Sequence, residues 1–376
     1  MLKRGSNKSI CFFSLNSKLV FERDMRHSGG AEIQQFQIAN YLLKLGWNVS
    51  FITAKINNCI DTDIKLYQTI DVDNLSNVNR FKRIAKYLLL LLKLMKIFFT
   101  LDADIVYQRG YTELTVLNYF FGKLFRKKIV FAGASNKDFI QSKQYRGRFL
   151  NKLMGILRRV DYVIVQHSDQ AELASNNGIE RVELIANISP SIYFAEIHET
   201  DSKYISWIGS LRKLKRPEIL LNLAKKLPMY QFQMIGPDDM KDLEYSRQIR
   251  YEASKIENIH IYGYQSAELL NKHLDESICL ISTSLTEGFP NTFLQAWARG
   301  KPVISYTFDF TTILSDQVDT SKFGIVSDEI EKIEMYIKSL VGMNPDLDLR
   351  NYVKNHYSQE IIGAKYDTLF SNLAQR

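Results

Sequence analysis

The chain has few cysteines among its 376 residues, and none of them has metal-ligand spacing. Cys11, Cys59 and Cys279 form an odd set, and Cys11 and Cys279 lie inside apolar runs, so we expect small buried thiols there. A disulfide framework is therefore excluded, and a reducing compartment is favoured. The six histidines also lack the spacing of a zinc site, so we expect no metal.

A long uncharged hydrophobic run is also missing. The most apolar segment, from Arg80 to Leu101, is interrupted by Lys86, Lys93 and Lys96, and it never reaches the roughly 18 apolar residues that a spanning helix needs. Because the N-terminus shows no signal-peptide pattern, we expect a cytoplasmic protein. The pattern suits two structures equally. One is a basic amphipathic helix on an anionic membrane surface, peripheral at the inner face of the cell membrane, and the other is a helix buried against a sheet.

A concentrated patch of positive charge is the third missing feature. Lys and Arg total 49 against 41 Asp and Glu, which gives a net charge of +8. This charge suits acidic partners such as nucleotide phosphates or anionic lipid. The basic residues are spread out rather than gathered beside stacking aromatic rings, so we expect no nucleic-acid partner.

Strand-like apolar runs alternate with helical patterns along the whole chain, which indicates an α/β fold with parallel sheets. The length suits two domains. We predict a Rossmann-like N-terminal domain over residues 1–190, a linker over 191–203 and a second Rossmann-like domain over 204–356. A C-terminal helix over 357–376 is expected to return to the first domain. Ligands of such domains bind at the carboxyl ends of the strands.

The sharpest local signal runs from Thr283 to Ala296, where a strand leads through a glycine-containing turn into a helix. A helix N-terminus offers N–H groups and a positive dipole end, which suit a phosphate. Glu287 precedes this helix and Gln295 lies inside it, so both could line one bound nucleotide sugar. The alternative is an ordinary βα turn with an incidental glutamate.

Two further segments have the same strand-loop-helix order. From residue 212 to 216, four of five residues are cations, and Arg212 and Lys215 could hold a diphosphate by forked hydrogen bonds and a point charge. The alternative is a solvated basic loop. Paired glycines, Gly29 and Gly30, follow the first strand and let backbone approach a phosphate or sugar, or else form a merely flexible loop.

Together, these three segments resemble the retaining family-4 glycosyltransferases of the GT-B fold. The Gly-Gly-Ala-Glu loop of that family is matched by residues 29–32, and its glycine followed by arginine and lysine is matched by Gly209, Arg212 and Lys215. Its two glutamates, with seven residues between them, are matched by Glu287 and Gln295. The resemblance implies two doubly wound Rossmann-like domains that face each other across a cleft. The first would be the acceptor side, and the second would bind the nucleotide sugar.

The resemblance also implies an activity and a set of site residues. The protein would move a sugar from a nucleotide diphosphate sugar, with UDP as the guess, to a glycan or lipid-linked acceptor in cell-surface polysaccharide synthesis. The reaction would retain the anomeric configuration and need neither a metal nor a cofactor. Arg212 and Lys215 would neutralise the departing diphosphate, and Glu287 would contact the sugar hydroxyls. The implied donor-binding residues are Gly29, Gly30, Gly209, Gly288, Phe289, Pro290, Asn291, Thr292 and Gln295.

Two departures from the family pattern stand out. Position 295 is Gln rather than Glu. A glutamine can still form a hydrogen bond with a ribose, but it loses charge assistance worth about 1 kcal/mol. The histidine that many members carry near the reaction centre is missing from residues 131–138. Ser135 and Asp138 are possible acceptor-side substitutes, although Asp138 also suits a loop cap. His167 follows a strand end and is another acceptor-side candidate, with a structural role as the alternative.

Other functions compete with transfer. A nucleotide-sugar epimerase of the same fold would need a carboxylate or histidine pair at the anomeric site, which the sequence does not reveal. A catalytically silent nucleotide-sugar-binding partner is kept open by Gln295. Three Asp-x-Asp pairs, at residues 61–63, 71–73 and 102–104, mimic the metal motif of another glycosyltransferase fold. One precedes its strand and the others lie in polar sequence, so chance explains them better.

Overall fold

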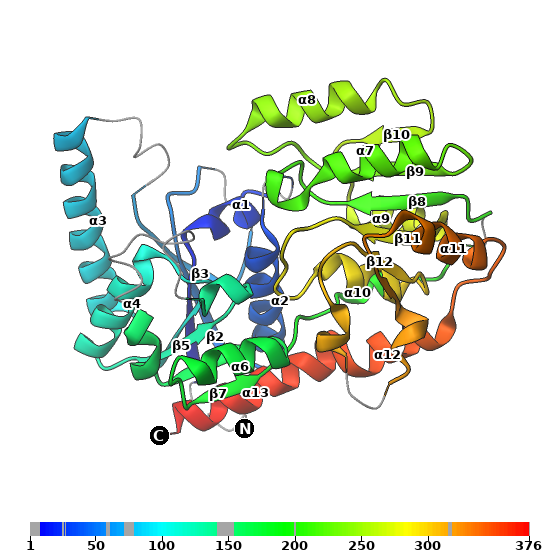
Figure 1. Cartoon of the computed structure of the whole chain (residues 1–376). Helices are drawn as coiled ribbons and strands as arrows, with labels where there is room; N and C mark the ends of the chain where they lie inside the picture. Colours follow the sequence, from blue (N-terminus) through cyan, green and yellow to red (C-terminus); the bar gives the residue numbers. More distant parts are fainter. Residues whose placement is uncertain are drawn as a thin grey trace. The chain divides into compact units, whose positions relative to one another are not determined.

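The computed structural model describes residues 8–24, 26, 28–57, 61–70, 79–140, 154–198, 201–314 and 318–375. The chain divides into two compact units. Unit 1 comprises Met1–Ala186 and Ile362–Arg376, and unit 2 comprises Asn187–Ile361. Each unit contains one parallel β-sheet with helices on both faces (Figure 1).

The sheet of unit 1 has seven parallel strands in the order β3-β2-β1-β4-β5-β6-β7. Their bounds are β1 Ser9–Phe13, β2 Asn48–Thr53, β3 Lys65–Gln68, β4 Ile105–Arg109, β5 Lys128–Ala132, β6 Tyr162–Val165 and β7 Val182–Leu184. All five residues of β1 and of β4 are buried, as expected for central strands covered on both faces. Burial raises the pKa of the Cys11 thiol to about 12, so the expected buried thiol is confirmed.

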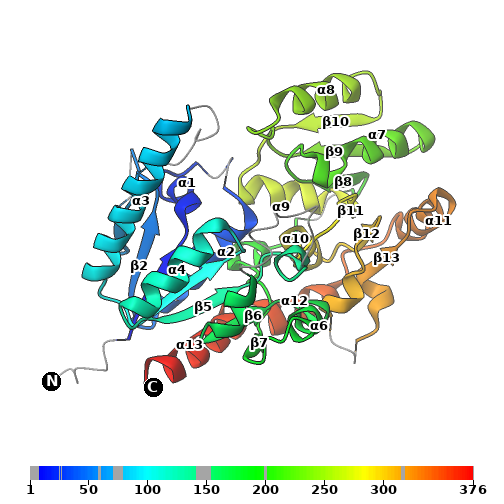
Figure 2. The ribbon, with the colours of Figure 1, turned by 60° about the vertical axis from the view of Figure 1, so that its left-hand side comes forward.

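Helices cover both faces of this sheet (Figures 1 and 2). The larger helices are α2 Gly30–Lys44, α3 Arg80–Thr100, α4 Glu113–Leu124, α6 Ser168–Asn176 and the C-terminal α13 Gln359–Ala374. The short ones are η1 Leu15–Ser17, α1 Lys18–Phe21, η3 Asn136–Asp138 and η4 Met154–Arg159. One core cluster joins α3, α4 and α6 to one face of the sheet. Aromatic contacts of α13 cover the other face, where Phe370 lies 5.9 Å from Tyr107 between ring centroids.

Two glycines in unit 1 have clear structural roles, one at the end of a helix and one where two helices pack closely together. Helix α2 ends at Lys44, and Gly46 shortly after it has a φ of +84°, the left-handed conformation typical of a helix stop. Gly363 lets α13 pack closely, because a Cβ there would lie 2.5 Å from the Tyr41 ring of α2. The Trp47 indole donates to an Asp367 carboxylate oxygen of α13 at 2.7 Å. Residues 362–375 therefore pack into the first unit.

The sheet of unit 2 has six parallel strands in the order β10-β9-β8-β11-β12-β13. Their bounds are β8 Tyr204–Ile208, β9 Gln231–Ile235, β10 Ile259–Tyr262, β11 Ser277–Ser282, β12 Val303–Ser305 and β13 Gly324–Val326. The helices are α7 Pro217–Lys226, α8 Leu243–Ala253, α9 Ala267–Asp275, α10 Asn291–Ala298, α11 Ile330–Leu340 and α12 Leu347–Tyr357. Four short helices accompany them: η5 Ser191–Phe194, η6 Lys213–Lys215, η7 Phe310–Ile313 and η8 Thr320–Phe323. Residues of α7, α8 and α11 form one core with the sheet.

Residues 191–203, predicted as a linker, lie within unit 2 rather than between the units. They begin with η5, whose Tyr193 is only 6% exposed. The fully buried Arg299 guanidinium donates to the carbonyls of Ala195 at 2.6 Å and Glu196 at 2.8 Å. It also donates to both carboxylate oxygens of Asp275, at 2.8 and 2.7 Å. The mixed composition of this segment is thus explained by packing against α9 and α10, which spacing alone does not reveal.

Helix α3 has one buried and one exposed apolar face. Leu90, Leu94, Ile97 and Phe98 belong to the core of unit 1. Large apolar side chains on the remaining surface are exposed: Phe81, Ile84, Tyr87, Leu88, Leu89, Leu91, Leu92, Met95 and Phe99. The helix is thus packed against the sheet on one face, as one of the two predictions expected, and the membrane-surface alternative stays a prediction. No helix in the described part of the chain is long and apolar enough to cross a membrane.

Candidate functional site

The predicted donor site lies where the strand order of unit 2 reverses direction. The chain passes from β8 to β9 on one side, while β11 lies on the other side of β8. Such a reversal leaves a crevice at the carboxyl ends of the two central strands, where open α/β sheets bind ligands. The loop after β8 carries Arg212 and Lys215, and the loop after β11 carries Glu287. The two loops that sequence patterns selected are therefore neighbours.

Hydrogen bonds tie these two loops together. The Leu285 N–H donates to the Leu214 carbonyl at 2.9 Å, and the Thr283 hydroxyl donates to the Lys215 carbonyl at 2.7 Å. The Thr283 hydroxyl in turn accepts from the buried Trp207 indole at 2.9 Å. Arg216 donates to the Thr283 carbonyl at 2.7 Å. The backbone of the cationic loop is thus fixed by the loop of Glu287, as a preorganised charged site requires.

The two loops also meet through an ion pair. Lys215 Nζ lies 2.5 Å from Glu287 Oε1, and the side chains are 19% and 14% exposed. Arg212 is exposed at the start of the same turn, where its carbonyl accepts from the Lys215 N–H at 2.8 Å. The structure therefore brings all three residues that the resemblance marks as catalytic to one edge of one sheet.

Glycines shape the base of the cationic loop. The Gly209 N–H donates to the Ile235 carbonyl at 2.9 Å, at the end of β9. Gly236 has a φ of +150°, and a Cβ there would lie 1.8 Å from the Gly209 carbonyl oxygen. Any side chain at Gly236 would therefore displace Gly209, which makes Gly236 a site residue that the pattern search missed. The Gly-Pro end of that strand was the only available signal.

The turn into α10 is largely buried. Gly288, Phe289 and Pro290 are buried, and Pro290 is the N-cap of the helix, which starts at Asn291 and continues through Thr292. The buried side chain of Asn187 donates to the Phe289 carbonyl at 2.9 Å and to the Asn291 side-chain oxygen at 2.8 Å. Asn187 thus anchors the proposed phosphate-binding turn, a role that its place before the predicted linker did not indicate.

Gln295 lies on α10 and donates its amide to the Tyr193 hydroxyl at 2.8 Å. Burial is the main cause that raises the pKa of Tyr193 well above its usual range, so this hydroxyl stays neutral. The neutral side chain at position 295 is therefore matched by a neutral hydroxyl rather than by a cation. Tyr193 was not predicted as a site residue, because its segment was assigned to a linker.

The candidates of unit 1 lie at the carboxyl ends of its strands. Gly29 is the N-cap of α2 and Gly30 its first residue, and both are exposed. Asp138 is a loop cap: its carboxylate accepts from the backbone N–H groups of Tyr111, Ala134 and Ser135 at 2.7–3.0 Å. Ser135 is the N-cap of the same turn. His167 is buried at the N-terminus of α6.

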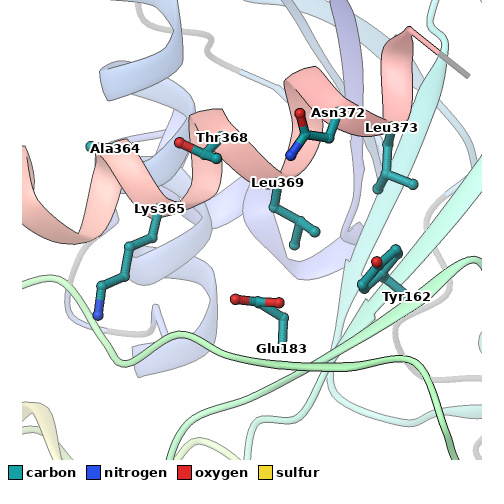
Figure 3. Close-up of a pocket in the computed structure, with 8 residues that line it drawn as sticks. All are labelled: Tyr162, Glu183, Ala364, Lys365, Thr368, Leu369, Asn372 and Leu373. Atoms are coloured by element: carbon teal, nitrogen blue, oxygen red, sulfur yellow. The ribbon is translucent and has the colours of Figure 1, made fainter.

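A groove of about 350 Å³ lies elsewhere in unit 1 (Figure 3). It runs between α13 and the edge of the sheet, where Leu369 and Leu373 point toward Glu183 of β7 and Tyr162 of β6. Tyr162 is the first residue of its strand, so this groove begins at the amino end of β6. It contains none of the predicted site residues and does not alter the assignment.

Comparison with known proteins supports the same region. Residues 190–357 match the family described as Glycosyl transferases group 1. A 141-residue stretch is 27% identical to the O-antigen biosynthesis glycosyltransferase WbnH of Escherichia coli, and it covers 37% of this chain and 39% of that relative. The chain therefore matches about two fifths of the length of this curated relative.

Solved structures extend the likeness to the whole chain as a fold. Sucrose-phosphate synthase from Thermosynechococcus elongatus has a TM-score of 0.77 and 17% identity, with 97% of this chain and 99% of that chain covered. The Anabaena Alr3699/HepE structure in complex with UDP-glucose has a TM-score of 0.71 and 13% identity, with coverages of 97% and 99%. The predicted GT-B fold is thereby confirmed, and residues 190–357 match the group 1 glycosyltransferase family within it.

Proposed function

We propose that the protein is a glycosyltransferase that moves a sugar from a nucleotide diphosphate sugar to a glycan or lipid-linked acceptor, in cell-surface polysaccharide synthesis. The observation that carries this proposal is the meeting of Arg212, Lys215 and Glu287 at the carboxyl ends of β8 and β11. The match to group 1 glycosyltransferases over residues 190–357 covers all three residues. Two cations and one carboxylate beside a helix N-terminus suit a ligand with a diphosphate at one end and hydroxyls at the other.

The leaving group defines what the site must do. When the bond between the anomeric carbon and the phosphate oxygen breaks, the nucleotide diphosphate gains negative charge. Arg212 and Lys215 would stabilise that charge, and the N-terminus of α10 would add its dipole. Because side chains can supply the positive charge, we propose a metal-independent reaction. Retention at the anomeric carbon is proposed from the family resemblance alone.

The donor nucleotide is proposed to be UDP. The HepE structure of the same fold was solved in complex with UDP-glucose, which supports the choice. In this proposal Glu287 accepts hydrogen bonds from the sugar, and the turn at residues 288–292 binds the phosphates. Gln295 bonds the ribose. Gly29 and Gly30 of unit 1 would approach the phosphates through their backbone, which their lack of a Cβ permits.

Mass-spectrometric screening of the purified protein against nucleotide sugars tests the activity. We expect one nucleotide sugar to be consumed with release of its nucleoside diphosphate, slowly with water and faster with an acceptor extract. Conversion to an isomeric nucleotide sugar without an acceptor would instead show an epimerase. Binding of UDP without turnover under any acceptor would show a silent binding protein.

We also propose that α3 docks the protein on an anionic membrane surface. Its exposed apolar residues include Phe81 and Phe99, which are 84% and 76% exposed. The neighbouring α4 adds Phe120 and Leu124, which are 59% and 66% exposed, and Phe125 just after α4 stacks edge-on against Phe99 at 6.1 Å. We call this two-helix surface the apolar face.

The charge pattern of α3 supports an anionic lipid surface as the partner. Lys82, Arg83, Lys93 and Lys96 are exposed between the apolar side chains, and α3 contains no Asp or Glu. Apolar side chains that enter lipid, together with cations at the headgroups, suit an anionic lipid surface. A peripheral position at the inner face of the cell membrane would place the enzyme beside lipid-linked acceptors.

Liposome sedimentation tests the apolar face. We expect binding to vesicles of phosphatidylglycerol and phosphatidylcholine, reversal of most of it at high salt, and little binding to phosphatidylcholine alone. The double change Phe81→Glu and Leu88→Glu should reduce binding to the anionic vesicles by about tenfold or more. It removes apolar surface that would be buried in lipid, and it lowers the positive net charge of α3. Met335→Glu is the control, since Met335 is 70% exposed on α11 of unit 2, between the 57% of Leu88 and the 84% of Phe81. Equal binding by all three proteins would contradict the proposal.

A further inference from the structure

The Lys215–Glu287 ion pair has a geometry that bears on product release. Both side chains are mostly buried, and their charged atoms lie 2.5 Å apart. Their backbones are held independently of that pair, through the Thr283 hydroxyl on the Lys215 carbonyl and the Leu285 N–H on the Leu214 carbonyl. The side chains can therefore separate without any change in the loops, since Lys has a flexible four-carbon stem.

We propose that Glu287 competes with the nucleotide diphosphate for Lys215, so that the pair opens when the donor binds and forms again to expel the nucleoside diphosphate. This inference rests on the proposed function. A carboxylate 2.5 Å from Lys215 already takes one of the three hydrogen bonds that the ammonium can donate, and it neutralises the charge that would attract a phosphate. If both anions stayed there, they would repel each other at short range in a mostly buried site.

The donor and the product differ in the hydrogen bonds that they can offer to Glu287 once its ion pair is broken. When the intact donor binds, the released carboxylate can accept hydrogen bonds from the sugar hydroxyls, and this offsets the loss of the pair. The nucleoside diphosphate lacks the transferred sugar, so its binding leaves Glu287 without that replacement. The ion pair thus selects for the donor against the product, and it disfavours inhibition by accumulated nucleotide.

A second ion pair in the same loop provides a matched control. Lys213 Nζ lies 2.8 Å from Asp242 Oδ2, but the side chains are 73% and 37% exposed. Asp242→Asn and Glu287→Gln each remove one negative charge that is paired with a lysine of this loop. Only the Glu287 carboxylate lies on a cation assigned to the diphosphate. A general change in electrostatic attraction would affect both variants alike.

Isothermal titration of the full chain with UDP, GDP and inorganic pyrophosphate tests the inference. Pyrophosphate is included because it reports on the phosphate site without any base. We expect Glu287→Gln to bind the nucleoside diphosphate and pyrophosphate about tenfold tighter than the natural chain, which corresponds to about 1.4 kcal/mol. Asp242→Asn should change these affinities by less than about twofold. Product inhibition of turnover should become stronger in Glu287→Gln, while its kcat falls.

A shortened carboxylate gives an independent measure. Glu287→Asp keeps the charge but withdraws it by one methylene, so we expect an affinity for UDP between those of the natural chain and Glu287→Gln. Equal or weaker binding of UDP and pyrophosphate by Glu287→Gln, with a normal melting temperature, would overturn the inference while leaving the proposed function intact. Failure of all variants to bind any of the three probes would overturn both.

Discussion

Lys215→Ala is expected to lower kcat with the nucleotide sugar by about 100- to 1,000-fold, the range seen when one group that stabilises transition-state charge is removed. Lys215 Nζ lies at the carboxyl end of β8, where negative charge is proposed to develop on the departing diphosphate. The effect should fall mainly on kcat, because the charge develops in the transition state. Steady-state kinetics at saturating donor, with circular dichroism to check the fold, is the measurement.

Lys213→Ala is the control for this prediction. Lys213 stands two residues earlier in the same turn, but its ammonium pairs with Asp242 and is largely exposed. We expect its kcat to stay within about threefold of the natural value, since an exposed charge is screened by solvent. Near-normal turnover of Lys215→Ala would contradict the assignment of Lys215 to the leaving group.

Arg299→Met is expected to destabilise unit 2 by about 3–5 kcal/mol, the usual cost of breaking a buried ion pair by removing one partner. The Arg299 and Asp275 side chains are 0% and 1% exposed. The substitution leaves a buried carboxylate without its cation and removes the donors to the carbonyls of Ala195 and Glu196. The segment that carries Tyr193 would lose its main tie to α10.

Urea unfolding followed by tryptophan fluorescence measures this loss, because Trp207 and Trp297 are both buried in unit 2. Lys332→Met is the matched control, since Lys332 forms an ion pair with Glu329 on the surface, where both side chains are more than half exposed. We expect no measurable shift of its unfolding midpoint. Equal midpoints for Arg299→Met and the natural chain would show that the buried pair is dispensable.

Sequence patterns predicted most of the regular elements because their causes are local. The apolar run at residues 10–15 and the helix ended by Gly46 follow from side-chain periodicity and from the left-handed conformation that glycine adopts readily. The same local rules place a loop with Arg212 and Lys215 after one strand and a turn with Glu287 after another. The existence and order of these elements were therefore within reach of the sequence.

Strand β3 and the packed structure of the predicted linker were not predicted, because their stability comes from distant partners. β3, at Lys65–Gln68, has no buried residue and is held by its pairing with β2. The segment 191–203 resembles a linker in composition, but Arg299, about a hundred residues later, binds its carbonyls. Asn187 and Tyr193 became site residues only through contacts with α10.

The burial of apolar side chains on helix α3 also depends on tertiary structure rather than on local sequence. Its sequence specifies a basic, leucine-rich helix with no acidic residue. Whether an apolar side chain of that helix is buried depends on where the sheet stops, and this is a property of the fold. The structure buries Leu90 and Leu94 and leaves Leu88 and Leu92 about half exposed.

Charge, glycine content and strand-loop-helix order are properties of short segments, so the amino-acid sequence alone was enough to select the residues that could neutralise a diphosphate. The ion pair between Lys215 and Glu287, which are 72 residues apart, follows only from the fold. The reason is that adjacency of β8 and β11 is set by the order of strands in the sheet, and that order depends on the burial of whole helices against both faces.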